Sequence, residues 1–174
     1  MSTVVFVEMP DFGHVNPSLP FVHELARRGE HVIYYDSREF QLQPEGAGAT
    51  FRAYPAGVLT STTIAQATQS GDLLRVPGLI QRATESLLPF LLEELPGQQP
   101  DVIVLDSNAL WGHMAARMLN LPTVPLMTTF LLSSAQLTQR RRCRSRCTPP
   151  AVIGKRPTRS RRTLLGPGQP EVAP

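Results

Sequence analysis

Short runs of apolar, β-branched and aromatic residues alternate along residues 1–137 with longer segments whose apolar residues recur at helical spacing. Continuous apolar runs are typical of strands that are buried on both faces, as in a parallel sheet covered by helices. The sequence therefore predicts an α/β fold, a Rossmann-like doubly wound parallel sheet. We expect its strands at residues 3–8, 31–36, 50–54, 102–105 and 123–127.

The segments between the strands carry helix signals. The first helix is predicted from Asn16 to about Arg28, because Asn16 can cap it, Pro17 suits a first turn and Gly29 follows the last basic residues. The polar, threonine-rich stretch after the third strand predicts a long loop with partial helix, a length usually reserved for function. That loop spans residues 55–70, and further helices are expected over 72–95, with Pro77 and Pro89 as kinks or breaks, over 109–119 and over 130–137.

The net charge of +3 hides an uneven distribution. Residues 1–137 carry a net charge of −6 and residues 138–174 a net charge of +9. The second segment is rich in arginine and proline and shows neither period, so it cannot bury enough apolar surface to offset its ordering entropy. We expect residues 1–137 to form one domain and residues 138–174 a disordered, basic, low-complexity tail. The abrupt change near Leu137 favours a frameshift or truncation, and a nucleic-acid-binding arm is the alternative.

Composition and motifs exclude several classes of protein. Both cysteines, Cys143 and Cys147, lie in the tail, which excludes a disulfide scaffold for the domain. No basic leader segment is visible, and no stretch approaches the roughly 20 apolar residues of a membrane span. We therefore expect a cytoplasmic protein without a membrane span. Metal-ligand clusters, a G-x-G-x-x-G turn after the first strand and a phosphate-binding G-K-[ST] loop are all missing from the domain, so no metal or cofactor site is predicted.

Two residues far apart in the sequence are expected to meet at the sheet. Ligands of open α/β sheets bind beyond the carboxyl ends of the strands, where the strand order reverses. In the common order 3-2-1-4-5, the first and fourth strands are neighbours, which brings His14 and Asp106 to one crevice. A histidine held by a carboxylate is a general-base arrangement. Because no G-x-S-x-G nucleophile accompanies the pair, the base would deprotonate a substrate hydroxyl, and Gly13 allows close backbone approach.

Simpler explanations exist for the same residues. A loop histidine is usually a solvated surface group, and an aspartate that ends a strand before a helix is often only an N-cap. His23, His31 and His113 are expected on helix surfaces or sheet edges. Trp111 and Phe130 fit a core or a pocket wall better than a reactive role.

The segment F-G-H-V-N-P-S-L-P-F-V-H-E-L-A-R-R-G-E-H-V-I-Y-Y, residues 12–35, resembles the opening of the macrolide-type branch of the family 1 glycosyltransferases, in the UDP-glycosyltransferase superfamily. The later P-D-V-I-V-L-D-S and L-P-T-V-P segments follow in the family's order and spacing. The resemblance covers residues 1–137 and implies the N-terminal, acceptor-binding domain of a two-domain GT-B fold, here incomplete.

The resemblance also implies roles. His14 matches the family's catalytic base, which deprotonates an acceptor hydroxyl for inverting attack on the anomeric carbon, and Asp106 matches the acid that orients it. The implied partners are a small lipophilic hydroxyl acceptor, such as a macrolide or a similar natural product, and a UDP- or dTDP-hexose donor. The residues expected to contact the acceptor are Phe12, Gly13, Asn16, Ser107, Trp111 and Phe130, with parts of residues 55–95.

One part of the family's pattern is missing. The donor domain and its H-C-G-containing motif, which hold the nucleotide sugar, have no counterpart in this sequence. The donor would be a co-substrate bound mainly there, and no cofactor is expected. We therefore predict that this chain alone is an inactive part of a glycosyltransferase. The alternative is a stand-alone acceptor-binding or auxiliary subunit without catalysis.

Overall fold

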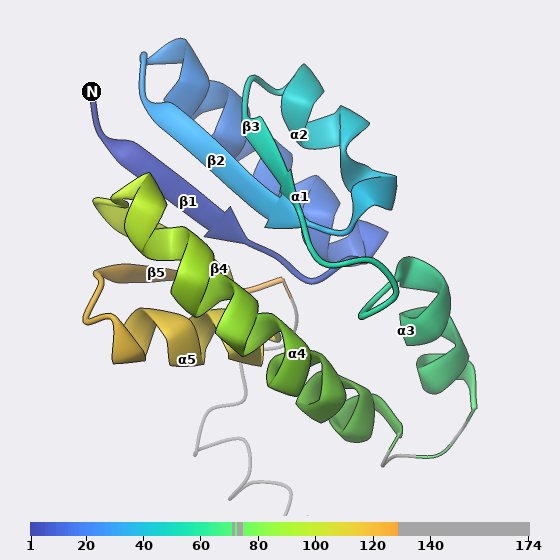
Figure 1. The fold of residues 1–174 in the computed structure, drawn as a ribbon. Coiled ribbons are helices and arrows are strands. Elements are labelled where there is room, and N and C mark those ends of the chain that lie inside the picture. The colour runs from blue at the N-terminus through green and yellow to red at the C-terminus, as the bar shows by residue number, and fades with distance from the viewer. Residues whose placement is uncertain (71, 73–74, 129–174) are drawn as a thin grey trace, which may run out of the picture. The chain divides into compact units, whose positions relative to one another are not determined.

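The computed structural model of the chain describes residues 1–70, 72 and 75–128. Its centre is a five-stranded sheet in the order β3-β2-β1-β4-β5, with every neighbouring pair parallel (Figure 1). The order reverses between β1 and β4, so the predicted α/β class and strand order are confirmed. The strands are β1 (Thr3–Val7), β2 (His31–Asp36), β3 (Thr50–Ala53), β4 (Val102–Asp106) and β5 (Thr123–Leu126).

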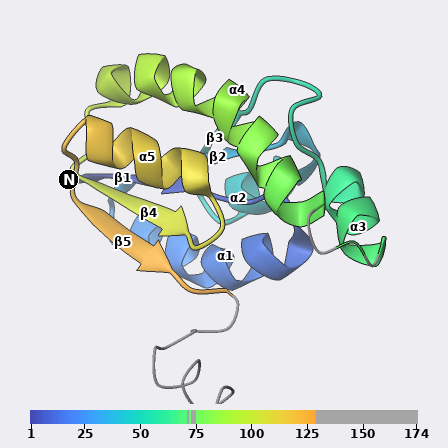
Figure 2. The ribbon, with the colours of Figure 1, turned by 90° about the horizontal axis from the view of Figure 1, so that it is seen from below.

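Helices cover both faces of the sheet. The long helix α4 and helix α5 lie on one face and α1 lies on the other, as Figure 2 shows. In the part of the chain that the structure describes, no helix has the length and apolarity that a membrane crossing requires. The helices are α1 (Phe12–Arg27), the 3-10 turn η1 (Arg38–Phe40), α2 (Leu42–Gly46), α3 (Ser61–Gln69), α4 (Arg75–Gln98) and α5 (Leu110–Met118).

The central strands are buried on both faces because successive side chains point to opposite sides. Val5 and Val7 of β1 pack under α4 and α5, in a cluster with Trp111. Val4 and Phe6 pack under α1, in a second cluster. Each face of the sheet thus has its own apolar core, which fixes the register of β1 against its neighbours.

Helix α1 begins earlier than the sequence predicted. Its N-cap is Asp11, whose extended backbone lets the carboxylate accept a hydrogen bond from the Gly13 amide at 2.8 Å. The predicted cap at Asn16 is wrong: Asn16 and Pro17 lie inside the helix. The predicted end is confirmed, since Arg28 is the C-cap and Gly29 follows with a left-handed φ of 83°. His14 therefore lies in the first turn of a helix and not in a loop.

The segment after β3 contains more helix than expected. Helix α3 opens with a reciprocal capping box between Thr60 and Thr63. Helix α4 runs through Pro89 without division, because its buried leucines pack against the sheet on both sides of that proline. Pro77 falls in the first turn, where a missing N–H costs no hydrogen bond. The predicted helix over 130–137 and the predicted tail over 138–174 lie outside the described residues.

Candidate functional site

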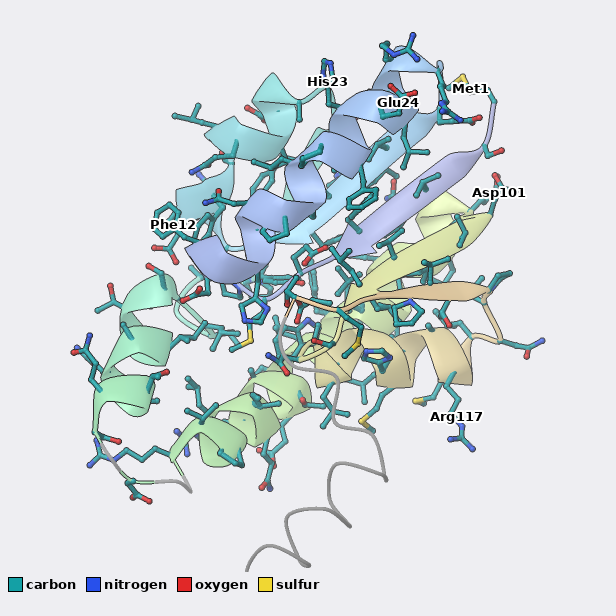
Figure 3. All side chains as sticks on the ribbon, turned by 180° about the vertical axis from the view of Figure 1, so that it is seen from behind. Met1, Phe12, His23, Glu24, Asp101 and Arg117 are labelled. Atoms are coloured by element: carbon teal, nitrogen blue, oxygen red, sulfur yellow. The ribbon has the colours of Figure 1, made fainter. Side chains whose placement is uncertain are left out.

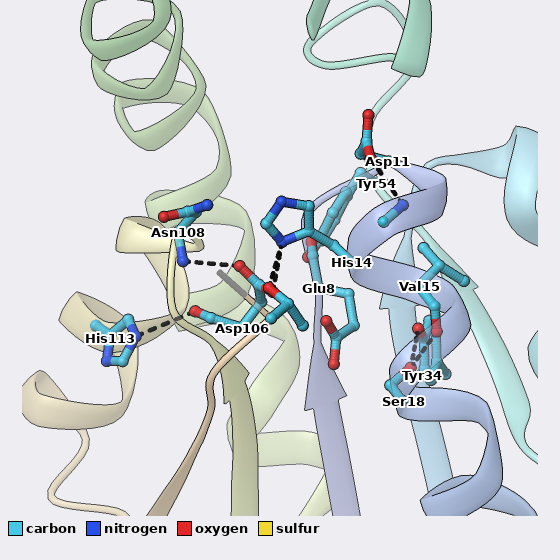
Figure 4. A network of polar contacts seen from close by, with 12 residues as sticks. Glu8, Asp11, His14, Val15, Ser18, Tyr34, Tyr54, Asp106, Asn108 and His113 are labelled. Atoms are coloured by element: carbon cyan, nitrogen blue, oxygen red, sulfur yellow. Dashed lines mark hydrogen bonds and ion pairs between the residues drawn. The ribbon is translucent and has the colours of Figure 1, made fainter. Parts of the chain in front are cut away.

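The imidazole of His14 and the carboxylate of Asp106 are in contact, as predicted from the strand order. Nδ1 of His14 lies 2.7 Å from Oδ2 of Asp106, across a sequence separation of 92 residues (Figure 4). His14 comes from the first turn of α1 and Asp106 from the end of β4. The Asp106 side chain is fully buried, whereas the His14 side chain is 12% exposed. The pair thus has its carboxylate inside and one side of its imidazole toward solvent.

A third side chain, Thr128, completes the site. Its hydroxyl donates a hydrogen bond to Oδ2 of Asp106 at 2.8 Å and lies 2.7 Å from Nδ1 of His14. The other carboxylate oxygen, Oδ1, accepts from the backbone amide of Asn108 at 2.7 Å. Both oxygens of Asp106 are therefore engaged, so its orientation is fixed. Thr128 was not predicted from the sequence, although its position two residues after the end of β5, next to β4 in the predicted order, was a usable signal.

These contacts select one form of the imidazole. A hydrogen on Nδ1 points at two oxygens, Oδ2 of Asp106 and the Thr128 hydroxyl, which leaves the lone pair on Nε2. Burial by itself would lower the pKa of His14, but the hydrogen bond and the charge of Asp106, with the charge of Asp11, outweigh it and raise that pKa. The site can therefore take up a proton at Nε2 and stabilise the resulting imidazolium.

A second histidine supports the carboxyl end of β4. Nε2 of His113, on α5, lies 3.2 Å from the backbone carbonyl oxygen of Asp106. His113 lies on a helix, as predicted, and is half-buried there. His113 contacts only the backbone of Asp106, so it contributes to the position of the strand end and not to the charge of the pair.

Several of the predicted acceptor-contacting residues lie near His14. Phe12 is 58% exposed, and its ring packs edge-on against Phe40 with centroids 4.9 Å apart. Gly13 and Asn16 are exposed on α1. Ser107 follows Asp106 directly, and its hydroxyl oxygen is buried with no hydrogen-bond partner among the described residues. Phe12 lies at the N-terminal end of α1, far along the helix from His23 (Figure 3).

Trp111, one of the residues predicted to contact an acceptor, lies in the core, which was the other interpretation of this residue. Its side chain is fully buried in the cluster between the sheet and helices α4 and α5. The indole N–H donates to the hydroxyl of Tyr54 at 3.2 Å, and that hydroxyl donates to the backbone oxygen of Glu8 at 2.9 Å. Trp111 therefore braces the loop after β1 from inside the core. Phe130 lies outside the described residues.

The region 55–95, parts of which were predicted to contact the acceptor, contains a cavity. A cavity of about 480 Å³ lies between α3 and α4, with Thr63, Gln66, Arg75 and Arg82 among its lining residues. None of the individually named site residues is among its lining residues. Among the residues that the structure describes, no group of three or more histidine, cysteine, aspartate or glutamate side chains could hold a metal ion. The polar chemistry of the site is thus that of His14, Asp106 and Thr128.

Fold and site together define a class: a doubly wound α/β domain with a histidine–carboxylate pair where its strand order reverses, suited to a ligand at the carboxyl edge of the sheet. No family model matches the sequence. The chain is 30% identical to NDP-glycosyltransferase YjiC of Bacillus subtilis over 128 residues. This matched region covers 73% of this chain and 32% of that protein. It is 28% identical over 132 residues to demethyllactenocin mycarosyltransferase of Streptomyces fradiae, which covers 71% and 29%.

Solved structures agree with this relationship. The calicheamicin glycosyltransferase CalG4 superposes with a TM-score of 0.65 at 23% identity, over 83% of this chain and 37% of that one. The glycotransferase of kitacinnamycin gives a TM-score of 0.63 at 24% identity, over 83% and 34%. These structures show the fold. In sequence, the chain is similar to curated glycosyltransferases, and it spans about a third of the length of the curated relatives it matches.

Proposed function

We propose that this chain supplies the acceptor-activating part of a glycosyltransferase, with His14 as general base. Nε2 of His14 takes the proton of an acceptor hydroxyl while the hydroxyl oxygen attacks the anomeric carbon of a nucleotide sugar. The new bond joins oxygen to that carbon, the bond to the diphosphate oxygen breaks, and the nucleoside diphosphate leaves with inversion. The observation that carries the proposal is the 2.7 Å contact between His14 and Asp106 at the switch point of the sheet.

The geometry suits proton abstraction because the charge that develops is already compensated. When Nε2 accepts the proton, the imidazolium forms beside the fully buried Asp106 carboxylate. Asn108 and Thr128 donate hydrogen bonds to the Asp106 carboxylate and fix its orientation. Asp106 therefore holds the ring orientation and stabilises its positive form without taking the proton.

The acceptor in this proposal is a small lipophilic natural product with a free hydroxyl, and the donor is a UDP- or dTDP-hexose. The exposed Phe12 ring offers apolar surface two residues from His14 along α1, and the exposed Asn16 offers a polar group. One relative is named as a mycarosyltransferase acting on demethyllactenocin. A spinosyn rhamnosyltransferase of similar fold, with a TM-score of 0.58, was solved with spinosyn aglycone.

The donor side is not provided by these 174 residues in the family's usual form, since the sequence contains no H-C-G triplet. We therefore expect the purified chain to give no measurable transfer from UDP-glucose or dTDP-glucose to macrolide or flavonol acceptors, as followed by mass spectrometry. Robust product formation would overturn this expectation.

The role of His14 is testable without turnover, by ¹⁵N NMR of its ring. We expect Nδ1 to carry the hydrogen, and a macrolide or flavonol acceptor with a free hydroxyl to shift the Nε2 resonance, whereas its O-methyl ether does not. The matched controls are His14→Gln, which removes the signal, and His23→Gln on the exposed side of the same helix, which leaves it unchanged. A hydrogen on Nε2 in the free chain, or no response to any hydroxyl acceptor at millimolar concentration, would refute the base assignment.

A further inference from the structure

Three acidic side chains form a row across the carboxyl edge of the sheet. Val7 pairs with Tyr35 of β2 and with Leu105 of β4. The next residues in register are Asp36, Glu8 and Asp106, on three adjacent strands. Residues at one register position point to the same face of a parallel sheet, with neighbouring strands about 4.8 Å apart. All three side chains are fully buried. We call Asp36, Glu8 and Asp106 the carboxyl row.

The members of the carboxyl row differ in their hydrogen-bond partners. Asp106 accepts hydrogen bonds at both oxygens. Asp36 accepts one, from the amide of Ser37 at 2.6 Å, and its Oδ2 has no partner among the described residues. Neither oxygen of Glu8 has a partner in the same described region. Three buried negative charges at this spacing repel strongly, so the carboxyl that receives no donor is the one that holds a proton.

We propose that Glu8 is a positioning residue of the site, held as a neutral carboxylic acid between Asp36 and Asp106 so that Asp106 keeps the negative charge that orients His14. The inference rests on the proposed role of His14. Glu8 acts through Asp106 and not on a substrate, since its side chain is fully buried.

The groups that face Glu8 support a neutral state. Figure 4 shows its carboxyl between Asp106 and the hydrogen-bonded Ser18–Tyr34 pair, whose oxygens are 2.7 Å apart. Tyr34, like Tyr54, is an uncharged phenol there, because burial raises its pKa. Burial first, and then the charges of Asp106 and Asp36, raise the pKa of Glu8 well above its ordinary value.

Asp36 shows the same tendency. Burial raises its pKa, against the hydrogen bond from Ser37, and the charges of Glu39 and Asp106 add to the rise. No cation stands among the groups that act on either carboxyl in the described part of the chain. The positive charge available to the row is that of a protonated His14, which contacts Asp106.

A neutral Glu8 has a consequence for the base. A second anion beside Asp106 would raise the pKa of His14. More of the imidazole would then already be protonated at neutral pH and unable to accept a proton from a substrate. With Glu8 neutral, Asp106 acts on His14 alone. The protonation of the carboxyl row thus determines the charge next to the base. The register of the sheet brings the three carboxyls of the row together.

The direct test is ¹³C NMR titration of glutamate side-chain carboxyls in the full chain, with Glu8→Gln to assign the Glu8 signal. Glu8 should keep its proton to a pH well above the ordinary range of glutamate side chains. The His14 ring should titrate at the same pH in Glu8→Gln as in the unmodified chain, and Glu93→Gln, at an exposed position, serves as the matched control. If Glu8 titrates in that ordinary range, or if Glu8→Gln lowers the His14 titration as Asp106→Asn does, the inference is wrong.

Stability gives a second measurement. A raised native pKa of an acid destabilises the fold as pH rises above its unfolded value, by about tenfold in the unfolding constant per pH unit up to the native pKa. Glu8→Gln should therefore gain stability relative to the unmodified chain with rising pH, and Glu93→Gln should not. If Glu8→Gln does not fold, the carboxyl titration of the unmodified chain still shows whether Glu8 holds its proton. If the His14 ring responds to an acceptor but Glu8 titrates in the ordinary range of glutamate, this inference is wrong and the proposed function is unaffected.

Discussion

Replacing Asp106 by asparagine removes the negative charge beside His14 while keeping the shape and an oxygen for the Asn108 amide. We expect the pKa of His14 to fall below its ordinary value of 6.5, because the burial that lowers it is then no longer outweighed. A hydrogen bond to a charged group contributes about 1.5–3 kcal/mol, and about 1.4 kcal/mol corresponds to one pKa unit. Because the contact is short, at 2.7 Å, and the His14 side chain is only 12% exposed, we expect the loss of free energy to lie in this range of about 1.5–3 kcal/mol.

The same change alters how stability depends on pH. A histidine whose native pKa is raised stabilises the fold fully below its unfolded pKa, and this stabilisation is lost as pH rises through the native pKa. Asp106→Asn therefore costs more at about pH 5.5 than at about pH 8.5, by about 1.5–3 kcal/mol of unfolding free energy.

Two measurements check these expectations: an NMR titration of the His14 ring, and urea unfolding at the two pH values. Asp101→Asn is the control, because Asp101 is an exposed carboxylate that accepts from the Thr3 amide at the opposite end of the sheet. An unchanged His14 titration in Asp106→Asn would show that the contact does not couple the two groups. A stability loss independent of pH would show that Asp106 acts only as a structural hydrogen-bond acceptor.

Two further substitutions test the framework of the site by urea unfolding. Gly112→Ala places a methyl group 2.7 Å from Leu105 and 2.8 Å from Val7 and should cost about 1–3 kcal/mol, against a helix-propensity gain of about 1 kcal/mol. Gly97→Ala, where nothing lies within 4 Å, should be neutral or stabilising, and equal effects would contradict the packing argument. Asp11→Ala removes the N-cap of α1 and should cost about 1 kcal/mol, whereas Asp11→Ser should restore most of it.

The sheet could be predicted from the sequence because its central strands leave few alternatives. A run such as Val4 to Val7 is apolar at every position, and only a strand covered on both faces buries all of it. Alternation with helices makes such strands parallel, and the usual strand order then places the ends of β1 and β4 side by side. The contact between His14 and Asp106 follows from topology, without knowledge of any side-chain packing.

Local sequence signals misplaced the start of one helix and did not decide the position of one side chain. The start of α1 was misplaced because Asn16-Pro17 has the form of a cap, but Asp11 is the residue whose carboxylate reaches a free amide. Trp111 was assigned to an acceptor because the family resemblance implied it, although a core position was the other interpretation. Its position on α5 turns it into the core, toward Tyr54, and one sequence does not reveal which face of a short helix is buried.

Thr128 shows that the strand order also predicts which residues from β5 lie beside Asp106. Since β5 is the neighbour of β4, a residue just past the end of β5 must lie beside one just past the end of β4, and the Ser107 amide indeed donates to the Leu126 carbonyl at 3.0 Å. The same step that paired His14 with Asp106 therefore points to the hydroxyl two residues after Leu126. It also points in the other direction, to Glu8 and Asp36, because a parallel sheet aligns every strand end at one edge and so concentrates whatever polar residues end its strands.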